Sequence, residues 1–335
     1  MRARGFATGA GFERASTDAE FWTASAAAVI RVYLHAAALA RRPVTDVLGW
    51  AARPADAEPV RILRSHPDAA PGWAEDLAGQ AGADPRTRDG VWAGVRRAFD
   101  CLADPRVLAT CSPSESAAFD PAAFLERGGT LYVVGSAGAQ LSVAPLIAAL
   151  VEDLAERALG LAAASRAGRL DPPLSLWLDE AANIAPLPSL TSLLSAGGGS
   201  GICTVVVLQS LAQARARWGP DRADAMWDAS TVRVVLGGLG HADDLTRISR
   251  LAGEVDEDVV SLARGAGGST WSTTLRSRPV LAPERLRALP PGRAVVLHRR
   301  TPPVETVLMP WWERACAPAV RRALDHAEAV CGGRR

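Results

Sequence analysis

The sequence predicts an α/β fold, a mainly parallel sheet flanked by helices with an all-α insert near its N-terminus. From Thr130 onward, short β-rich runs alternate with helical stretches, and apolar residues on both faces of these runs are typical of buried parallel strands. Before that point the chain has only helical patterns separated by prolines. We expect an N-terminal stub of the core at 1–15, an all-α domain at 16–105, the core at 106–312, and a C-terminal helix and tail at 313–335.

The helices of the all-α domain follow from apolar periodicity, and Pro54, Pro67 and Pro85 mark turns between them. The most apolar stretch of the chain, Ala24–Ala40, is interrupted by Arg31 and His35 and is short for a membrane span. The predicted helices are Phe21–Arg41, Val44–Ala52, Gly72–Ala81 and Thr87–Leu102.

The strands of the core are predicted from short runs rich in Val, Leu and Ile. A helical pattern at Ser142–Leu159 lies between the first two, and Trp312–Val330 reads as one amphipathic helix. The predicted strands are Thr130–Gly135, Leu174–Asp179, Cys203–Leu208, Val232–Gly237 and Ala294–His298.

Composition restricts the partners only weakly. The formal charge of +1 gives no overall attraction to nucleic acid or anionic lipid, so such contacts would need local arginine patches. The sequence contains no lysine, and all 37 basic residues are arginine. The five cysteines lack zinc spacing and are interpreted as cytosolic thiols.

Asp179 and Glu180 follow a predicted buried strand, and ligands of open parallel sheets collect at the carboxyl ends of strands. In ATP-hydrolysing P-loop proteins, an Asp at this place helps to hold Mg²⁺ and the next Glu orients or activates the attacking water. The dipeptide alone also fits a solvated strand end. The G-x-x-x-x-G-K-[ST] loop that completes such a site is absent, because there is no lysine.

Gln209 ends the next predicted strand, where a polar side chain fits a γ-phosphate sensor. A strand-end Gln is by itself usually a turn or capping group, but two strand ends with such side chains favour the catalytic interpretation. Arg215, Arg217 and Arg222 then cluster around Trp218. They could contact DNA phosphates or act as arginine fingers, or they could form a solvated helix face.

Three other features have structural interpretations. The glycines of Gly197–Gly201 follow a helix and precede a strand, which favours a helix C-cap over a phosphate cradle. Gly265–Thr270 reads as a flexible surface loop. His241, Asp243 and Asp244 match no common metal-ligand spacing, and a helix N-terminus explains the acids. We expect no metal beyond Mg²⁺ bound with ATP.

These residues resemble the TraG/TraD-type coupling proteins of type IV secretion and conjugation, within the FtsK/HerA group of P-loop ATPases. The most specific parts are Asp-Glu-Ala-Ala-Asn-Ile-Ala-Pro from Asp179 and Leu-Gln-Ser-Leu-Ala-Gln from Leu208. Residues 174–298 resemble the region that recognises the relaxosome accessory protein TraM. Similar segments are Tyr33–Ala40, Phe119–Leu154, Leu176–Leu190, Val205–Gly219 and Arg278–Leu297.

The resemblance implies a RecA-like core in a homo-hexamer on the cytoplasmic side of the bacterial inner membrane. Such a motor uses ATP and Mg²⁺ to move a relaxase–DNA substrate into a secretion channel, and it grips the DNA backbone without reading sequence. Asp179, Glu180 and Gln209 take the Walker B and sensor roles. The glycine loop at 197–201 lacks the arginine that many relatives carry there, which removes one candidate for inter-subunit catalysis.

Three interpretations stay open. The chain could be the C-terminal portion of a coupling-protein ATPase, truncated by a misplaced start or a broken gene, with a gap in the sheet beside the strand of Gln209. It could be a non-catalytic adaptor that binds relaxosome components. It could also be an FtsK/HerA-type DNA pump, which would share the catalytic residues without the long helical insert.

Overall fold

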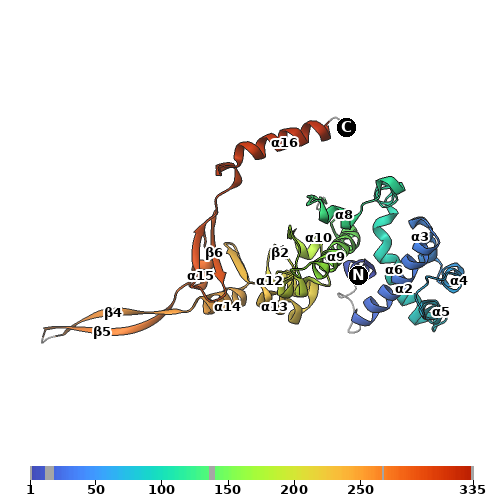
Figure 1. The fold of residues 1–335 in the computed structure, drawn as a ribbon. Helices are drawn as coiled ribbons and strands as arrows, with labels where there is room; N and C mark the ends of the chain where they lie inside the picture. Colours follow the sequence, from blue (N-terminus) through green and yellow to red (C-terminus); the bar gives the residue numbers. More distant parts are fainter. Residues whose placement is uncertain (1, 12–18, 136–139, 266–267, 333–335) are drawn as a thin grey trace. The chain divides into compact units, whose positions relative to one another are not determined.

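The computed structural model describes residues 2–11, 19–135, 140–265 and 268–332 (Figure 1). The chain forms two compact units, Met1–Ala229 and Ser230–Arg335. The domain bounds predicted from the sequence divide the chain differently and stay a prediction.

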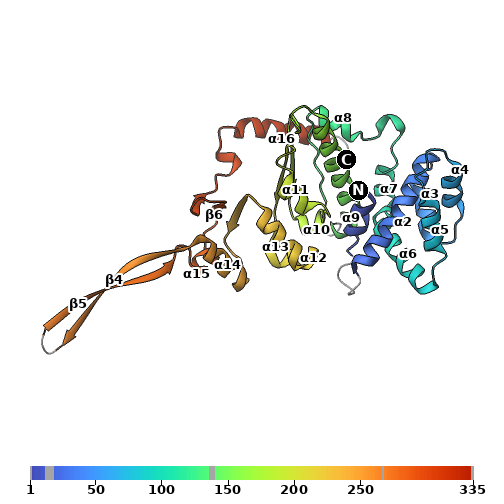
Figure 2. The ribbon, with the colours of Figure 1, turned by 60° about the horizontal axis from the view of Figure 1, so that its bottom comes forward.

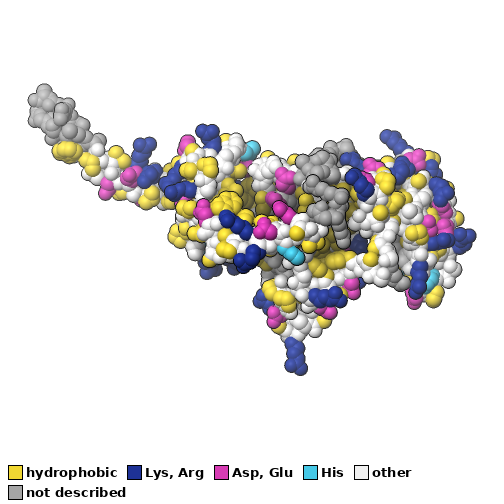
Figure 3. All heavy atoms as spheres, turned by 90° about the horizontal axis from the view of Figure 1, so that it is seen from above, with side chains coloured by type: hydrophobic (Ala, Val, Ile, Leu, Met, Phe, Trp, Pro, Cys, Tyr) yellow, Lys and Arg dark blue, Asp and Glu magenta, His cyan; other side chains and the backbone are white. Residues whose placement is uncertain are grey.

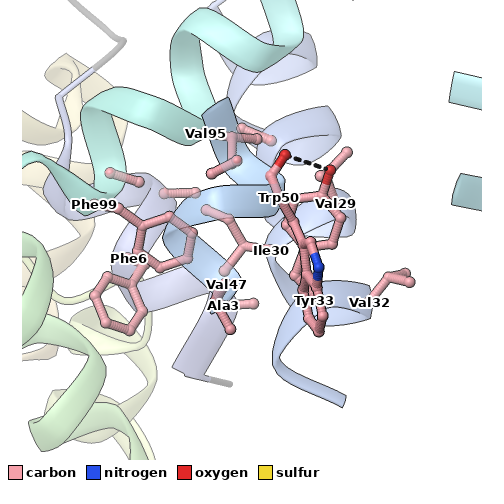
Figure 4. Close-up of a cluster of buried hydrophobic side chains, with 14 of the residues drawn as sticks. Ala3, Phe6, Val29, Ile30, Val32, Tyr33, Val47, Trp50, Val95 and Phe99 are labelled. Atoms are coloured by element: carbon pink, nitrogen blue, oxygen red, sulfur yellow. Dashed lines mark hydrogen bonds between the residues drawn. The ribbon is translucent and has the colours of Figure 1, made fainter. Parts of the chain in front are cut away.

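The first unit contains the expected helical region. Its core is aromatic: Trp50 and Trp92 are fully buried, and Figure 4 shows Trp50 beside Tyr33. The Tyr33 hydroxyl donates to the Trp50 carbonyl oxygen at 3.2 Å and accepts from Trp92 Nε1 at 3.2 Å, so the buried polar atoms are satisfied. The helices are α2 (Ala19–Leu39), α3 (Val44–Ala52), α4 (Glu58–Ser65), α5 (Trp73–Ala81), α6 (Pro85–Phe99) and α7 (Pro105–Thr110), with a 3-10 turn at Asp100–Ala103.

Helix α1 (Arg2–Gly9) packs against the long helix α9 (Gln140–Ala164) at very close approach. A Cβ atom added at Gly5 would lie 2.7 Å from the backbone of Ala149, and one at Gly9 would clash with the backbone of Pro145. Only glycine permits this spacing. The glycine-rich start of the sequence is therefore a helix-packing device.

The α/β part of the first unit is built on two parallel strands, β1 (Leu174–Leu178) and β2 (Ile202–Val206). Their buried face, which includes Leu176, Leu178 and Ile202, packs in one core with residues of α9. Within the described ranges each strand pairs only with the other, so the outer edges of both strands are unpaired. The surrounding helices are α8 (Pro121–Glu126), α10 (Ala181–Ile184), α11 (Leu190–Ala196), α12 (Leu211–Trp218) and α13 (Pro220–Ala229).

The second unit holds a three-stranded antiparallel sheet in the order β3-β6-β7 and a separate hairpin of β4 and β5. In Figures 1 and 2 the hairpin is a narrow ribbon that leads away from α14 and α15. The elements are β3 (Val232–Leu236), α14 (Ala242–Ala252), β4 (Glu254–Gly265), β5 (Gly268–Pro279), α15 (Pro283–Arg287), β6 (Arg293–His298), β7 (Val304–Val307), a 3-10 turn at Trp311–Glu313 called η4, and α16 (Ala317–Gly332).

Two local predictions were wrong. Thr130–Gly135 forms no strand: it has no regular secondary structure and no ladder partner, and Tyr132 and Val134 are 83% and 91% exposed. Its β propensity is high, but a strand also needs a neighbour to pair with. Of Gly265–Thr270, the described residues belong to strands β4 and β5, with Gly265 paired with Gly268, and 266–267 lie outside the described residues. The acidic run at Glu254–Asp258 hid the first strand, since charged residues are uncommon in strands.

Candidate functional site

The polar residues predicted at two strand ends meet in the structure. Asp179 and Glu180 directly follow β1, and Gln209 lies three residues beyond the end of β2. The strands run parallel in register, from Leu174 beside Ile202 to Leu178 beside Val206, so both carboxyl ends lie at one edge. Gln209 Nε2 donates a 2.6 Å hydrogen bond to Glu180 Oε1. Residues 29 positions apart thus form one polar cluster.

The backbone at Glu180 is unusual. Its φ of 46° and ψ of 42° lie in the left-handed region, which non-glycine residues seldom occupy and which costs of order 1–3 kcal/mol. The Glu180 N–H donates to Asp179 Oδ1 at 3.0 Å, and the next amide, of Ala181, donates to the Val207 carbonyl at 3.3 Å. These bonds hold a turn that directs the Glu180 carboxylate towards Gln209. Strained backbone of this kind concentrates at functional sites.

Helix α12 fixes the other partner. Ser210 caps the helix by accepting the Gln213 N–H at 3.2 Å, and Gln213 Oε1 accepts the Gln209 N–H at 3.2 Å. This pair resembles a capping box, with the glutamine bonding one residue further out than usual. Gln213 therefore orients Gln209, whose side chain in turn contacts Glu180. Sequence analysis did not assign Gln213, although the Ser-x-x-Gln spacing was visible.

The loop after the acid pair is held at two points that sequence analysis also missed. Glu152 on α9 is 1% exposed and accepts hydrogen bonds from Ser189 N at 2.9 Å and Ser189 Oγ at 2.7 Å. Trp218 on α12 donates from Nε1 to the Leu187 carbonyl at 3.3 Å. A glutamate inside the apolar stripe of a helix, four residues after Ala148, was the available signal for Glu152.

The three arginines predicted as arginine fingers or DNA contacts have different surroundings. Arg217 is the buried one: it is 8% exposed and donates to the Thr8 and Gly9 carbonyls at 3.3 and 3.0 Å. These oxygens lie at the C-terminus of α1, where a cation is stabilising. Arg215 is half-buried on the same helix. Arg222 is half-exposed and lies 3.8 Å from Glu20.

The other two candidate segments have local structural contacts. Gly197–Gly201 joins α11 to β2, and the Gly197 N–H donates to the Leu193 carbonyl at 3.0 Å, as a helix C-cap does. His241 caps α14, accepting the Asp244 N–H on Nδ1 at 3.4 Å. Across the described ranges, no three His, Cys, Asp or Glu residues gather as a metal site.

Helix α2 is long and apolar enough to cross a membrane by length and composition. In the structure, 39% of its most apolar window is buried, and core helices of soluble proteins pass the same test. By these measures it is weak evidence for a membrane span.

Comparison with known proteins first defines the class of fold. The solved structure of the bacterial conjugative coupling protein TrwBdeltaN70 in its unbound form aligns with a TM-score of 0.67 and 19% identity, over 92% of this chain and 67% of that one. TrwB in complex with ADP and Mg²⁺ aligns with a TM-score of 0.63 and 19% identity, over 92% and 67%. The chain therefore has the RecA-like P-loop fold of these structures, as predicted.

Two sequence comparisons then indicate the family. Residues 173–291 match the family model described as the TraM recognition site of TraD and TraG. The conjugal transfer protein TraG of Agrobacterium fabrum is 25% identical over 234 residues, 69% of this chain and 34% of that protein. TraG of Rhizobium radiobacter is 26% identical over 154 residues, 45% and 24%. The predicted resemblance to TraG/TraD-type conjugative coupling proteins is confirmed. The matched part of the chain spans 34% of the length of the Agrobacterium fabrum protein and 24% of the length of the Rhizobium radiobacter protein.

Proposed function

We propose that this chain is part of a coupling-protein ATPase, in which ATP hydrolysis drives a relaxase–DNA substrate into a conjugation or secretion channel. The observation that carries the proposal is the hydrogen bond between Gln209 and Glu180 at the ends of two parallel strands. A water-activating carboxylate and a phosphate-sensing amide need to be adjacent at that edge. The family match over residues 173–291 supports the same assignment.

The side chains at this edge fit the metal and water side of a nucleotide site. Mg²⁺ is usually held by one or two carboxylates together with phosphate oxygens and water, and Asp179 is an exposed carboxylate at the strand end. A bound Mg-nucleotide would supply the phosphoryl group and neutralise its charge. Glu180 would then orient the attacking water and accept its proton. Gln209, hydrogen-bonded to Glu180, would report whether the γ-phosphate is present.

The phosphate-gripping side of such a site is outside these residues. A Walker A loop requires a lysine and the sequence has none, so hydrolysis would depend on a phosphate-binding loop supplied by other polypeptide. Three further properties of the proposed motor also involve polypeptide or partners beyond the residues of this site. These are a homo-hexamer at the cytoplasmic face of the inner membrane, contact with the DNA backbone, and recognition of a relaxosome accessory protein through residues 173–291.

The test is a transfer assay in cells that depend on this gene. Glu180→Gln and Gln209→Ala are expected to lower the frequency of plasmid transfer by roughly 100-fold or more, the usual effect of losing a general base. Glu126→Gln, which neutralises an exposed glutamate at the end of α8, is the matched control and should transfer normally. Immunoblots establish equal protein levels. Wild-type transfer by Glu180→Gln would refute the ATPase proposal.

The absence of lysine favours one alternative, a non-catalytic adaptor that binds relaxosome components. The same assay separates the two functions. An adaptor would tolerate Glu180→Gln and still lose transfer when the gene is deleted, whereas an ATPase would lose transfer in both strains.

A further inference from the structure

The β4–β5 hairpin, called the arm below, has two chemically different faces. Directly paired residues share a face and alternate residues change face. One face carries the carboxylates at its base and then Val260, Trp271 and Leu275, which are 55%, 69% and 69% exposed. From Glu254 to Val260, and on the paired residues from Thr273 to Pro279, this acidic–apolar face carries no basic side chain. Its carboxylates are Glu254, Asp256 and Asp258.

The opposite face is internally compensated. Arg278 Nε lies 2.7 Å from Glu257 Oε2 on that face, and Arg276 is paired directly with Glu257 across the ladder. Two basic side chains and one acidic side chain leave it mildly positive. Space-filling atoms show hydrophobic and charged side chains exposed together along the arm (Figure 3). The faces thus differ in charge, which gives the arm a defined binding side.

A two-stranded ribbon is only marginally stable by itself in water. Exposing a tryptophan and a leucine on the same side of such a ribbon costs further free energy, and clustered exposed apolar residues mark interaction sites. A DNA partner is disfavoured by the carboxylates of the acidic–apolar face, which repel phosphates. The arm therefore requires a protein surface that is apolar and bordered by positive charge.

The same compact unit contains such a surface. A groove of about 610 Å³ is formed where β7 leads into η4, and its apolar lining includes Val307, Met309 and Trp312, which are 68%, 57% and 56% exposed. Because these side chains are more than half exposed, the groove is an open apolar surface on which an indole and its neighbours can lie.

The border of the groove carries the complementary charge. Arg293 lines it and shares the carboxylate of Glu305 with Arg285, at 2.9 and 2.6 Å, so two guanidinium groups have one carboxylate between them. Arg314 donates from Nε to the Met309 carbonyl at 3.2 Å, and it offsets Glu313 of the lining. The border therefore has a net positive charge opposite to that of the acidic–apolar face.

We propose that the arm of one copy lays its acidic–apolar face in the groove of a second copy of this chain. In both ribbon views the arm extends away from the sheet that leads into the groove, so its distal half does not meet the groove of its own copy (Figures 1 and 2). Arm and groove are different surfaces, which makes the contact head-to-tail, the type that can build rings. Trp271 is the anchor, since buried tryptophans dominate such interfaces.

The test is photo-crosslinking between isotopically distinct copies of the full chain. A photoreactive phenylalanine analogue replaces Leu275, and this protein is mixed with ¹⁵N-labelled wild-type chain before irradiation. We expect mass spectrometry to find a peptide of the unlabelled copy joined to a labelled peptide that contains residues 307–313. The same analogue at Val255, on the opposite face, is the matched control and should give far less of that product.

Sedimentation velocity provides the second measurement. Trp271→Ala with Leu275→Ala should weaken self-association at least about tenfold, as loss of an interface anchor does. Trp177→Ala is the control: it removes a 75% exposed tryptophan from the first unit and should leave this association unchanged. Far-ultraviolet circular dichroism establishes that each variant is folded. The proposal would be overturned if crosslinks formed only to other segments, or if the double variant associated as strongly as the wild type. Both measurements are independent of nucleotide hydrolysis, so they can fail or succeed separately from the proposed ATPase function.

Discussion

Replacing Glu152 by alanine should loosen the loop that follows the acid pair. Its carboxylate, 1% exposed, accepts both the N–H and the hydroxyl of Ser189. Hydrogen bonds to a charged acceptor contribute about 1.5–3 kcal/mol each, and some of that is returned because the carboxylate no longer has to be desolvated. We expect a local loss of about 3 kcal/mol. Glu152→Gln keeps an acceptor of the same shape and should lose about 1 kcal/mol.

Hydrogen exchange measures this loss where it occurs. Each 1.4 kcal/mol corresponds to tenfold, so the Ser189 amide should exchange roughly 100-fold faster in Glu152→Ala and about fivefold faster in Glu152→Gln. Ser189→Ala removes only the hydroxyl bond, and a double-mutant cycle with Glu152→Ala should give a coupling of at least about 0.5 kcal/mol. Less than a twofold change at Ser189 in a folded Glu152→Ala protein would refute the assignment of Glu152 as the anchor of this loop.

Two further predictions concern the buried polar groups of the first unit. Arg217→Ala should destabilise α1 by about 2 kcal/mol, seen as faster exchange of its amides, because two carbonyls lose a cationic donor. Arg222→Ala removes a half-exposed ion pair and should change the free energy of unfolding by less than about 0.5 kcal/mol. Equal destabilisation by Arg217→Ala and Arg222→Ala would contradict the different roles assigned to the two arginines. Burial raises the pKa of Tyr33 to about 12, so Tyr132→Phe protein, in which Tyr33 is the only tyrosine, should form phenolate near pH 12 in an absorbance titration. Because the folded protein favours the neutral phenol, the free energy of unfolding should fall as the pH rises from about 10 to 12. Ionisation of Tyr33 near pH 10, while the helical circular dichroism signal is intact, would show that Tyr33 is not buried.

The parts of the site are joined by helix α12. Its first turn orients Gln209 through Gln213, and its last turn contacts the loop after the acid pair through Trp218 and helix α1 through Arg217. One helix thus contacts the backbone of Gln209, the loop after the acid pair and helix α1.

The sequence predicted the local features of the chain because they depend on neighbours in sequence. Apolar periodicity placed the strands that lead to Asp179 and Gln209, and the glycines at 197–201 indicated a helix C-cap. The same reasoning failed at Thr130–Gly135, where the residues favour a strand but no partner strand pairs with them in the described structure.

What only the tertiary structure decided depends on contacts between residues far apart in the chain. Arg217 and Arg222 look alike in sequence, yet one is bound to carbonyls 208 and 209 residues away and the other is on the surface. The contact of Glu152 with a loop 37 residues later was equally invisible. The positions of strands and of the polar residues at their ends follow from short sequence patterns. Whether a charged side chain is buried depends instead on which distant backbone groups lack a hydrogen-bond partner once the helices have packed, and the sequence pattern does not contain that information.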